Sequence, residues 1–227
     1  MSKVRIPSGL GSGTTRAVTL ALLLASLTTA AAIPPPRDAA PWVGTTLEGS
    51  ACDGGPQLHG PFDYLQRAEF ARDLRLTEDY HFNSKKQDLF FTLRVWPNHH
   101  QALYQVVRLR IASWGDRKNK PQVPAECFLQ RAVNFSPKDA TAHMLYGLLL
   151  HRLHKNPPAL EHYRKAVELN PTDLQTKYNL ALLLVDMEEY AEAQQLAREV
   201  YAGNFPLQGL KSKLARLGYW QGEQEQD

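Results

Sequence analysis

The sequence predicts an all-α fold: an α-α superhelix of about three helical hairpins, with an N-terminal helical cap and a C-terminal capping helix. First, amphipathic stretches end at spaced prolines, and the spacing of Pro137 and Pro171, about 34 residues, is typical of helical-hairpin repeats. Proline ends a helix because it lacks an amide hydrogen and its ring clashes with the preceding turn. Second, small residues recur at fixed positions of this period, as helices in close contact require: Gly147 and Ala181 at position 8, Ala125, Ala159 and Ala193 at position 20, and Ala132 and Ala166 at position 27.

The repeat array is expected at residues 98–207, divided into the units 98–139, 140–173 and 174–207. The first unit is longer than the others, because Pro97 lies further from Pro137 than Pro137 does from Pro171. The polar stretch from Gly115 to Pro124 is the expected place for the inserted residues.

Helices are also expected on both sides of the array. Apolar residues at helical spacing in 61–97 predict two helices, which form an N-terminal cap or a degenerate repeat. Leucines recur at i, i+3, i+7 and i+10 in 208–220, which predicts a capping helix over the last repeat. Residues 221–227 form a polar tail.

Residues 1–32 resemble a secretory signal peptide. They contain three basic residues and no acidic one, then an apolar run from Ala17 to Leu27, then small residues up to Ala32. A membrane anchor is the alternative, but the apolar run is only about 10 to 16 residues long, whereas roughly 20 are needed to span a bilayer. We therefore expect export with cleavage near Ala32, a periplasmic or secreted location, and no stable membrane insertion afterwards. Residues 33–60 are rich in proline and glycine and predict an extended arm.

Charge argues against a nucleic-acid partner. The whole chain carries 26 basic and 23 acidic residues, and the predicted signal holds three of the basic ones. The remaining chain is therefore near neutral, without the basic surface that phosphate binding requires.

The two cysteines, Cys52 and Cys127, both follow the predicted signal. An even number of cysteines in an oxidising compartment favours a disulfide bond. This bond closes a loop of about 75 residues and contributes on the order of 4 kcal/mol by chain entropy. We expect it to tether the arm to the first repeat, whereas a redox or metal role lacks a second cysteine at CxxC spacing.

The segment from about Phe62 to Trp220 resembles exported bacterial tetratricopeptide repeat (TPR) proteins. A poorly characterised subgroup of them shows blocks similar to Gly60-Pro61-Phe62-Asp63-Tyr64, Pro97-Asn98-His99-His100 and Glu126-Cys127. The resemblance implies an α-α superhelix that binds a peptide or another protein in a concave groove, with no enzymatic activity and no cofactor.

The carboxylate-binding residues of chaperone-type TPR domains are mostly missing, since only Arg108 and Asn179 resemble them. The side chains that the first helices present to the groove instead suit an apolar or amphipathic segment. The alternative is that some of these side chains pack between repeats or lie beneath the arm. The candidate groove residues are Tyr104, Arg108, Met144, Leu148, Tyr178, Asn179 and Leu182.

A metal-binding protein, an enzyme and a polysaccharide-assembly factor are the rival functions. The pairs His99-His100 and His151/His154 have spacings that suit a metal, but no acidic residue or cysteine accompanies them at ligand spacing. We expect these histidines to be exposed at helix ends and assign no metal site. No nucleophile motif on a strand-to-helix turn is present, so no catalytic residue is assigned.

Overall fold

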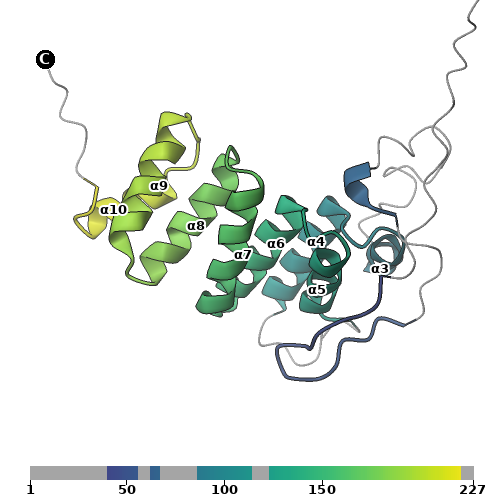
Figure 1. Cartoon of the computed structure of the whole chain (residues 1–227). Coiled ribbons are helices and arrows are strands. Elements are labelled where there is room, and N and C mark those ends of the chain that lie inside the picture. The colour runs from purple at the N-terminus through teal and green to yellow at the C-terminus, as the bar shows by residue number, and fades with distance from the viewer. Residues whose placement is uncertain (1–39, 56–61, 67–85, 114–122, 221–227) are drawn as a thin grey trace, which may run out of the picture. The chain divides into compact units, whose positions relative to one another are not determined.

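The structure, a computed structural model, describes residues 40–55, 62–66, 86–113 and 123–220 (Figure 1). Within these residues the predicted all-α fold is confirmed, and extended pairing is limited to an isolated bridge between Thr45 and Ala51. The predicted signal peptide at 1–32 and the polar tail at 221–227 lie outside the described residues. The helices are η1 (Tyr64–Gln66), α3 (Lys86–Val95), α4 (His100–Ala112), α5 (Ala125–Phe135), α6 (Ala140–Arg152), α7 (Asn156–Leu169), α8 (Leu174–Asp186), α9 (Tyr190–Ala202) and α10 (Gly209–Arg216).

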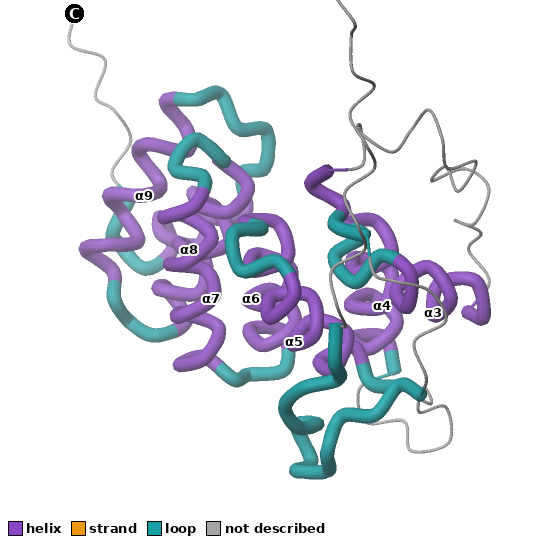
Figure 2. The backbone as a smooth tube through the Cα atoms, turned by 45° about the vertical axis from the view of Figure 1, so that its right-hand side comes forward, coloured by secondary structure: helices purple, strands orange, loops and turns teal. Residues whose placement is uncertain are grey.

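The period of the sequence is visible in the helix bounds. Helices α6 and α8 begin at Ala140 and Leu174, and their partners α7 and α9 begin at Asn156 and Tyr190, so both offsets equal the spacing of Pro137 and Pro171. Each helix packs against the next one along the chain, and Figures 1 and 2 show the hairpins side by side in chain order. Tandem hairpins with this period and contact pattern are a TPR-like fold.

The turns inside the two hairpins have the same geometry. His154 and Glu188 occupy equivalent positions, and both adopt a left-handed backbone, with φ of 57° and 65°. In each turn the next amide donates to a carbonyl of the preceding helix, Lys155 to Leu150 at 2.8 Å and Glu189 to Leu184 at 2.9 Å. This bond satisfies a carbonyl that the helix end would otherwise leave unpaired.

Small residues allow the helices of a hairpin to approach each other closely. The side chain of Tyr163 on α7 packs over Gly147 on α6, where a Cβ atom would lie 2.7 Å from the tyrosine ring. Ala159 and Ala166 of α7 and Ala193 of α9 are also completely buried. The recurring small positions of the sequence are therefore helix contacts.

The segments that flank the array differ in how much of them is described. Of the two helices predicted in 61–97, the structure shows α3 and the short η1, while residues 67–85 lie outside the described part. The expected insertion in the first repeat falls mostly in 114–122, which is also outside it. Helix α10 packs against both α8 and α9 and buries Leu210 and Leu214.

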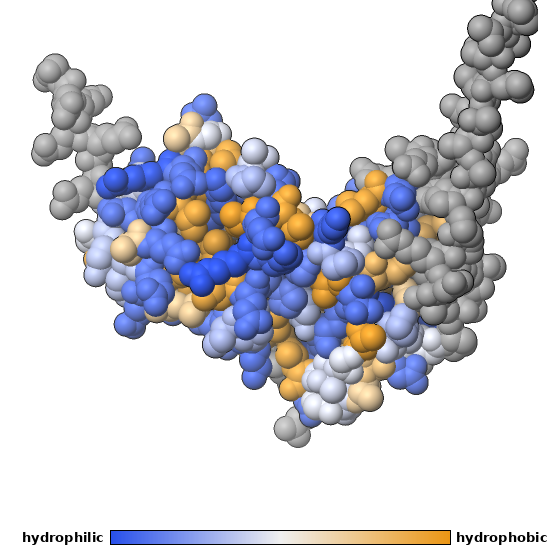
Figure 3. Space-filling view, in the orientation of Figure 1, coloured by the Kyte–Doolittle hydropathy of each residue, from blue (hydrophilic) through white to orange (hydrophobic). Residues whose placement is uncertain are grey.

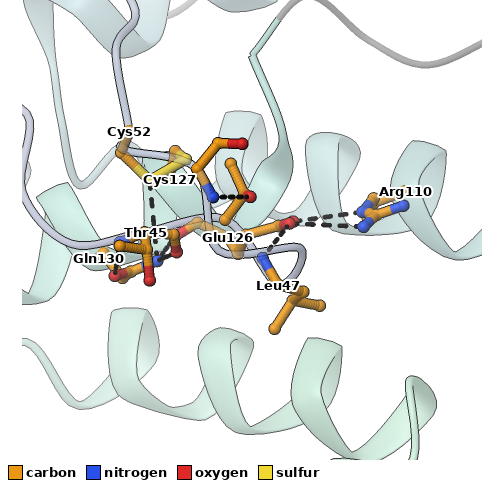
Figure 4. The surroundings of a disulfide bond; sticks show 9 residues. Thr45, Leu47, Cys52, Arg110, Glu126, Cys127 and Gln130 are labelled. Carbon is orange, nitrogen blue, oxygen red and sulfur yellow. Dashed lines mark hydrogen bonds and ion pairs between the residues drawn. A yellow bond between two sulfur atoms is a disulfide. The ribbon is translucent and has the colours of Figure 1, made fainter.

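The disulfide bond Cys52–Cys127 attaches the described part of the arm to α5, with the two Cα atoms 5.4 Å apart (Figure 4). Polar contacts surround it. The Gln130 side chain accepts from the Thr45 amide at 3.2 Å and donates to the Thr45 carbonyl at 2.8 Å. Glu126, which has no exposed surface, accepts from the Leu47 amide at 3.2 Å.

Arg131 of α5 anchors the beginning of the described arm. This arginine is almost completely buried, and its guanidinium donates to the carbonyls of Ala40 at 2.7 Å and Leu93 at 2.6 Å. It also lies 4.9 Å from the ring centre of Trp42, which packs edge-on against Phe128. Burial lowers the pKa of Arg131 to about 10, with nearby Arg94 contributing to the shift, so the side chain remains charged at neutral pH.

Residues 62–66, at the start of the predicted N-terminal cap, are held by a buried polar network. The Asn98 amide nitrogen donates to Asp63 and to Asp139, each at 2.8 Å, and its oxygen accepts from the Tyr64 amide at 2.9 Å. Asp139 in turn caps α6 by accepting from the Ala142 amide at 3.1 Å. One asparagine thus links residues 62–66 to the starts of the first two repeats.

The sequence predicted that the histidines next to Asn98 are exposed, and the structure shows that they are not. His99 is 2% exposed, and its ring caps α4 by accepting from the Ala102 amide at 3.2 Å. The Nε2 atom of His100 is 2.8 Å from an Asp139 oxygen. Both rings lie against Tyr64, which contributes to their burial.

Candidate functional site

The first helices of the three hairpins, α4, α6 and α8, form a continuous layer because α4 contacts α6 and α6 contacts α8. All seven candidate groove residues come from these helices. The described arm contacts α5 instead, with its polar anchors at Glu126 and Gln130. Residues 62–66 are anchored at Asn98.

Tyr104 and Arg108 are the exposed members of the candidate set. Tyr104 is 44% exposed, a large value for an aromatic side chain, and Arg108 is also exposed. The two lie one helical turn apart on α4, and the guanidinium carbon is 5.9 Å from the centre of the tyrosine ring. Contact with a cation orients the ring and leaves both groups accessible to a ligand.

Met144, Leu148 and Leu182 are partly exposed and pack with one side against the core. Met144 and Leu148 lie one turn apart on α6, at the same repeat positions as Tyr104 and Arg108 on α4. Leu182 on α8 is the repeat equivalent of Leu148. We refer to Tyr104, Arg108, Met144, Leu148 and Leu182 as the inner face.

Tyr178 and Asn179 do not belong to an open face, and this corrects the sequence-based selection. Tyr178 is 7% exposed because the ring of Phe205 covers it at 5.0 Å between ring centres. Asn179 is 9% exposed, accepts from Gln175 at 3.2 Å and donates to the Met144 sulfur at 3.7 Å. The chain that follows α9 folds over Tyr178, and both positions become packing contacts.

The inner face therefore combines one aromatic ring, one guanidinium and three apolar side chains. On the side of the molecule drawn in Figure 3, apolar areas are separated by hydrophilic ones. A ligand for the inner face needs apolar groups that match its individual apolar side chains, and Arg108 favours an acidic group next to them.

His151, a polar side chain at the edge of the layer of first helices, is already paired. His151 at the end of α6 is 2.9 Å from Asp186 of α8, and Lys213 of α10 contacts the same carboxylate. Burial lowers the pKa of His151, whereas the hydrogen bond that His151 donates to Asp186 raises it, and burial prevails. His151 thus faces Asp186, while His154 is exposed in the left-handed turn, so the His151/His154 metal pair stays unassigned.

Sequence reasoning missed a pair of histidines on neighbouring helices. His143 of α6 and His162 of α7 have their Nδ1 atoms 3.1 Å apart. They are 19 residues apart in the chain, so no helical spacing connects them. The fold of the hairpin brings them together, and a search for i, i+3 or i, i+4 pairs cannot find them.

Comparisons with known proteins find similarity only among solved structures. No protein-family model and no curated protein matches the chain. The solved structures that match part of it include residues 41 to the end of MamA from Desulfovibrio magneticus RS-1 and the MamA RS-1 ArsTM double mutant. Each is 22% identical with a TM-score of 0.41, and the match covers 51% of this chain and 62% of the other.

This chain therefore spans less than two thirds of the length of these two solved chains. A likeness this distant carries no inference about activity or partners. Across the described ranges, no cluster of three or more potential metal-ligand residues occurs, and no helix combines the length and apolar character that crossing a bilayer requires.

Proposed function

We propose that this protein is exported and acts as a scaffold or adaptor in the cell envelope, binding a peptide or protein segment on its inner face without catalysis or cofactor. The observation that carries the proposal is that Arg108, Leu148 and Leu182 share one repeat position on successive first helices that contact one another, with Tyr104 one turn from Arg108. Proteins that use stacked helical hairpins commonly bind extended or helical segments along such a layer.

The composition of the inner face suggests the kind of segment that binds. Tyr104 offers a large rigid contact surface, and tyrosine is among the side chains that dominate binding energy at interfaces. Met144 adapts to different apolar groups because its side chain is unbranched and polarizable. With Arg108 beside Tyr104, an amphipathic segment with an acidic group near its apolar residues fits best.

A comparison of variants after crosslinking in envelope fractions tests binding at this face. We expect the double variant Tyr104→Ala/Leu148→Ala to recover at least tenfold less of a partner than the wild type, because it removes two central contacts. The matched control Arg164→Ala/Arg198→Ala changes two exposed side chains of the second helices α7 and α9. Both variants must keep wild-type helix content. Equal recovery by the inner-face variant and the wild type would contradict the proposal.

Export is tested separately, because it depends on residues 1–32 and not on the helices. We expect the chain purified from an envelope fraction to begin near Ile33, as intact-mass measurement can show. A cytoplasmic protein that keeps residues 1–32 would contradict export and leave the binding proposal standing.

A further inference from the structure

The contact between His143 and His162 fixes the proton positions on both rings. The Nε2 atom of His143 is 3.3 Å from the Pro137 carbonyl oxygen, which can only accept, so Nε2 carries the proton. The Nδ1 atom of His143 therefore presents a lone pair to His162, and the Nδ1 hydrogen of His162 is donated to it across 3.1 Å. Histidines that bind a metal usually donate their other ring nitrogen to a carboxylate, a backbone carbonyl or water, as His143 does here.

The separation of the two nitrogens matches the span of two ligands on one metal ion. With metal–nitrogen bonds of about 2.0–2.1 Å, two nitrogens lie about 2.9 Å apart at a right angle and about 3.4 Å apart at a tetrahedral angle. The observed 3.1 Å lies between these values. The helices already hold the two Nδ1 atoms at this distance, and binding requires the rings to turn so that both lone pairs point to the metal.

The surroundings keep both rings neutral and oriented. Burial lowers the pKa of His162 to about 4, with the neighbouring His143 contributing to the shift. Burial also lowers the pKa of His143, which faces the Pro137 carbonyl, Asp139 and Glu168 on the favourable side and Lys165 on the opposing side. The ring of His162 packs 4.2 Å from that of Tyr146, which limits its rotation.

We propose that His143 and His162 form a two-histidine binding site for a divalent transition-metal ion, with water completing the coordination. Imidazole nitrogens suit Cu²⁺, Ni²⁺ and Zn²⁺, and among these Cu²⁺ binds most tightly to such ligands. Binding shifts the proton of His162 from Nδ1 to Nε2, so both Nδ1 lone pairs face the metal and neither ring loses a proton. The absence of a third histidine, cysteine or carboxylate among the described residues leaves positions open for water or for a group of a bound partner.

Titration of the untagged full chain with Cu²⁺, followed by electron paramagnetic resonance, tests this site. We expect a signal with hyperfine coupling to two nitrogens in the wild type. We expect His162→Gln and His143→Gln each to weaken Cu²⁺ binding at least tenfold and to lose the two-nitrogen coupling. The control His154→Asn changes an exposed histidine in a left-handed turn, a conformation that asparagine tolerates, and should bind as the wild type does.

An unchanged affinity and spectrum in both glutamine variants would overturn the site, and so would loss of binding in the control variant alone. If a variant loses helix content, the wild type still decides the matter by nuclear magnetic resonance. Substoichiometric Cu²⁺ should then broaden the imidazole resonances of His143 and His162 before those of His154. Broadening of other histidines first would contradict the proposal.

Discussion

Single buried side chains determine how firmly the arm is attached. Arg110 is also buried. Its Nε atom donates to Glu126 at 3.2 Å, and its Nη2 atom donates to Glu48 of the arm at 3.1 Å. Glu126 also accepts from the Leu47 amide. The Glu126 carboxylate thus neutralises a buried guanidinium and also accepts a hydrogen bond from an arm amide. The sequence positions of Arg110 and Leu47 do not reveal these contacts.

Replacing Glu126 should therefore be costly. Glu126→Gln leaves the Arg110 charge with less compensation inside the protein, and we expect the free energy of unfolding to fall by about 3 kcal/mol. Glu192→Gln is the matched control, because it breaks an exposed ion pair with Arg164 and should cost less than about 1 kcal/mol. Denaturant unfolding of both variants measures the difference. Equal losses in the two variants would show that the buried ion pair contributes no more to the free energy of unfolding than the exposed one.

Tyr163 offers a prediction of opposite sign. Its ring fills the space over Gly147, but its hydroxyl is buried without a hydrogen-bond partner among the described residues. Tyr163→Phe keeps the ring and removes an unpaired polar group, so we expect stability to rise by about 1 kcal/mol. The same unfolding measurement checks this value, and a loss of stability would mean that the hydroxyl is hydrogen-bonded in solution.

The pKa of His162 makes stability depend on pH. Its folded pKa of about 4 lies below the unfolded value of 6.5, so the unfolded chain takes up the proton first as the solution is acidified. This contribution to stability is complete above pH 6.5 and is lost as pH falls from 6.5 toward 4.

Asp139 affects stability at lower pH. Burial opposes the ionisation of its carboxyl group, but hydrogen bonds from His100, Asn98 and the Ala142 amide outweigh burial and lower its pKa below 3.8. Its contribution to stability is therefore lost below that pH.

Unfolding measurements between pH 7 and 4 test the assignment to His162. We expect His162→Gln to lose less stability over this range than the wild type, while the exposed-site control His154→Asn follows the wild type. A pH dependence that is the same in all three proteins would assign the effect to other groups.

At the scale of helices, the repeat could be predicted because it depends on local residues. Gly147, Ala159 and Pro171 report close helix contacts and helix ends, and the helices lie where these residues place them. The burial of Tyr178 could not be predicted, because it depends on the path of the chain after α9. The His143/His162 pair was missed for a similar reason, since two helices must pack before the rings meet.

The disulfide bond is the element-scale feature whose removal has the clearest expected result. In Cys52→Ala/Cys127→Ala the arm keeps its hydrogen bonds but loses the covalent tether, so we expect a loss of about 4 kcal/mol by chain entropy. Hydrogen exchange should become faster at the amides of Thr45 and Leu47 and stay unchanged in α8 and α9. Unchanged protection of the arm would show that polar contacts alone hold it.

At the scale of the whole molecule, the described residues combine hairpins that pack against one another with an arm fastened to α5 of the first hairpin. Asn98 joins Asp63 of the cap region to Asp139 at the start of the second hairpin, across 35 and 41 residues of sequence. No spacing rule predicts contacts between residues this far apart in the chain. The described arm leaves Tyr104 exposed, which keeps the inner face accessible.

The central claim is that a partner segment binds across α4, α6 and α8. Site-specific photocrosslinking tests it most directly, with the photoreactive residue placed at Tyr104, at Leu182 or, as the control, at the exposed Arg198 of α9. We predict that Tyr104 and Leu182 crosslink to the same partner and that Arg198 does not. Crosslinking from Arg198 with none from Tyr104 or Leu182 would contradict binding on the inner face.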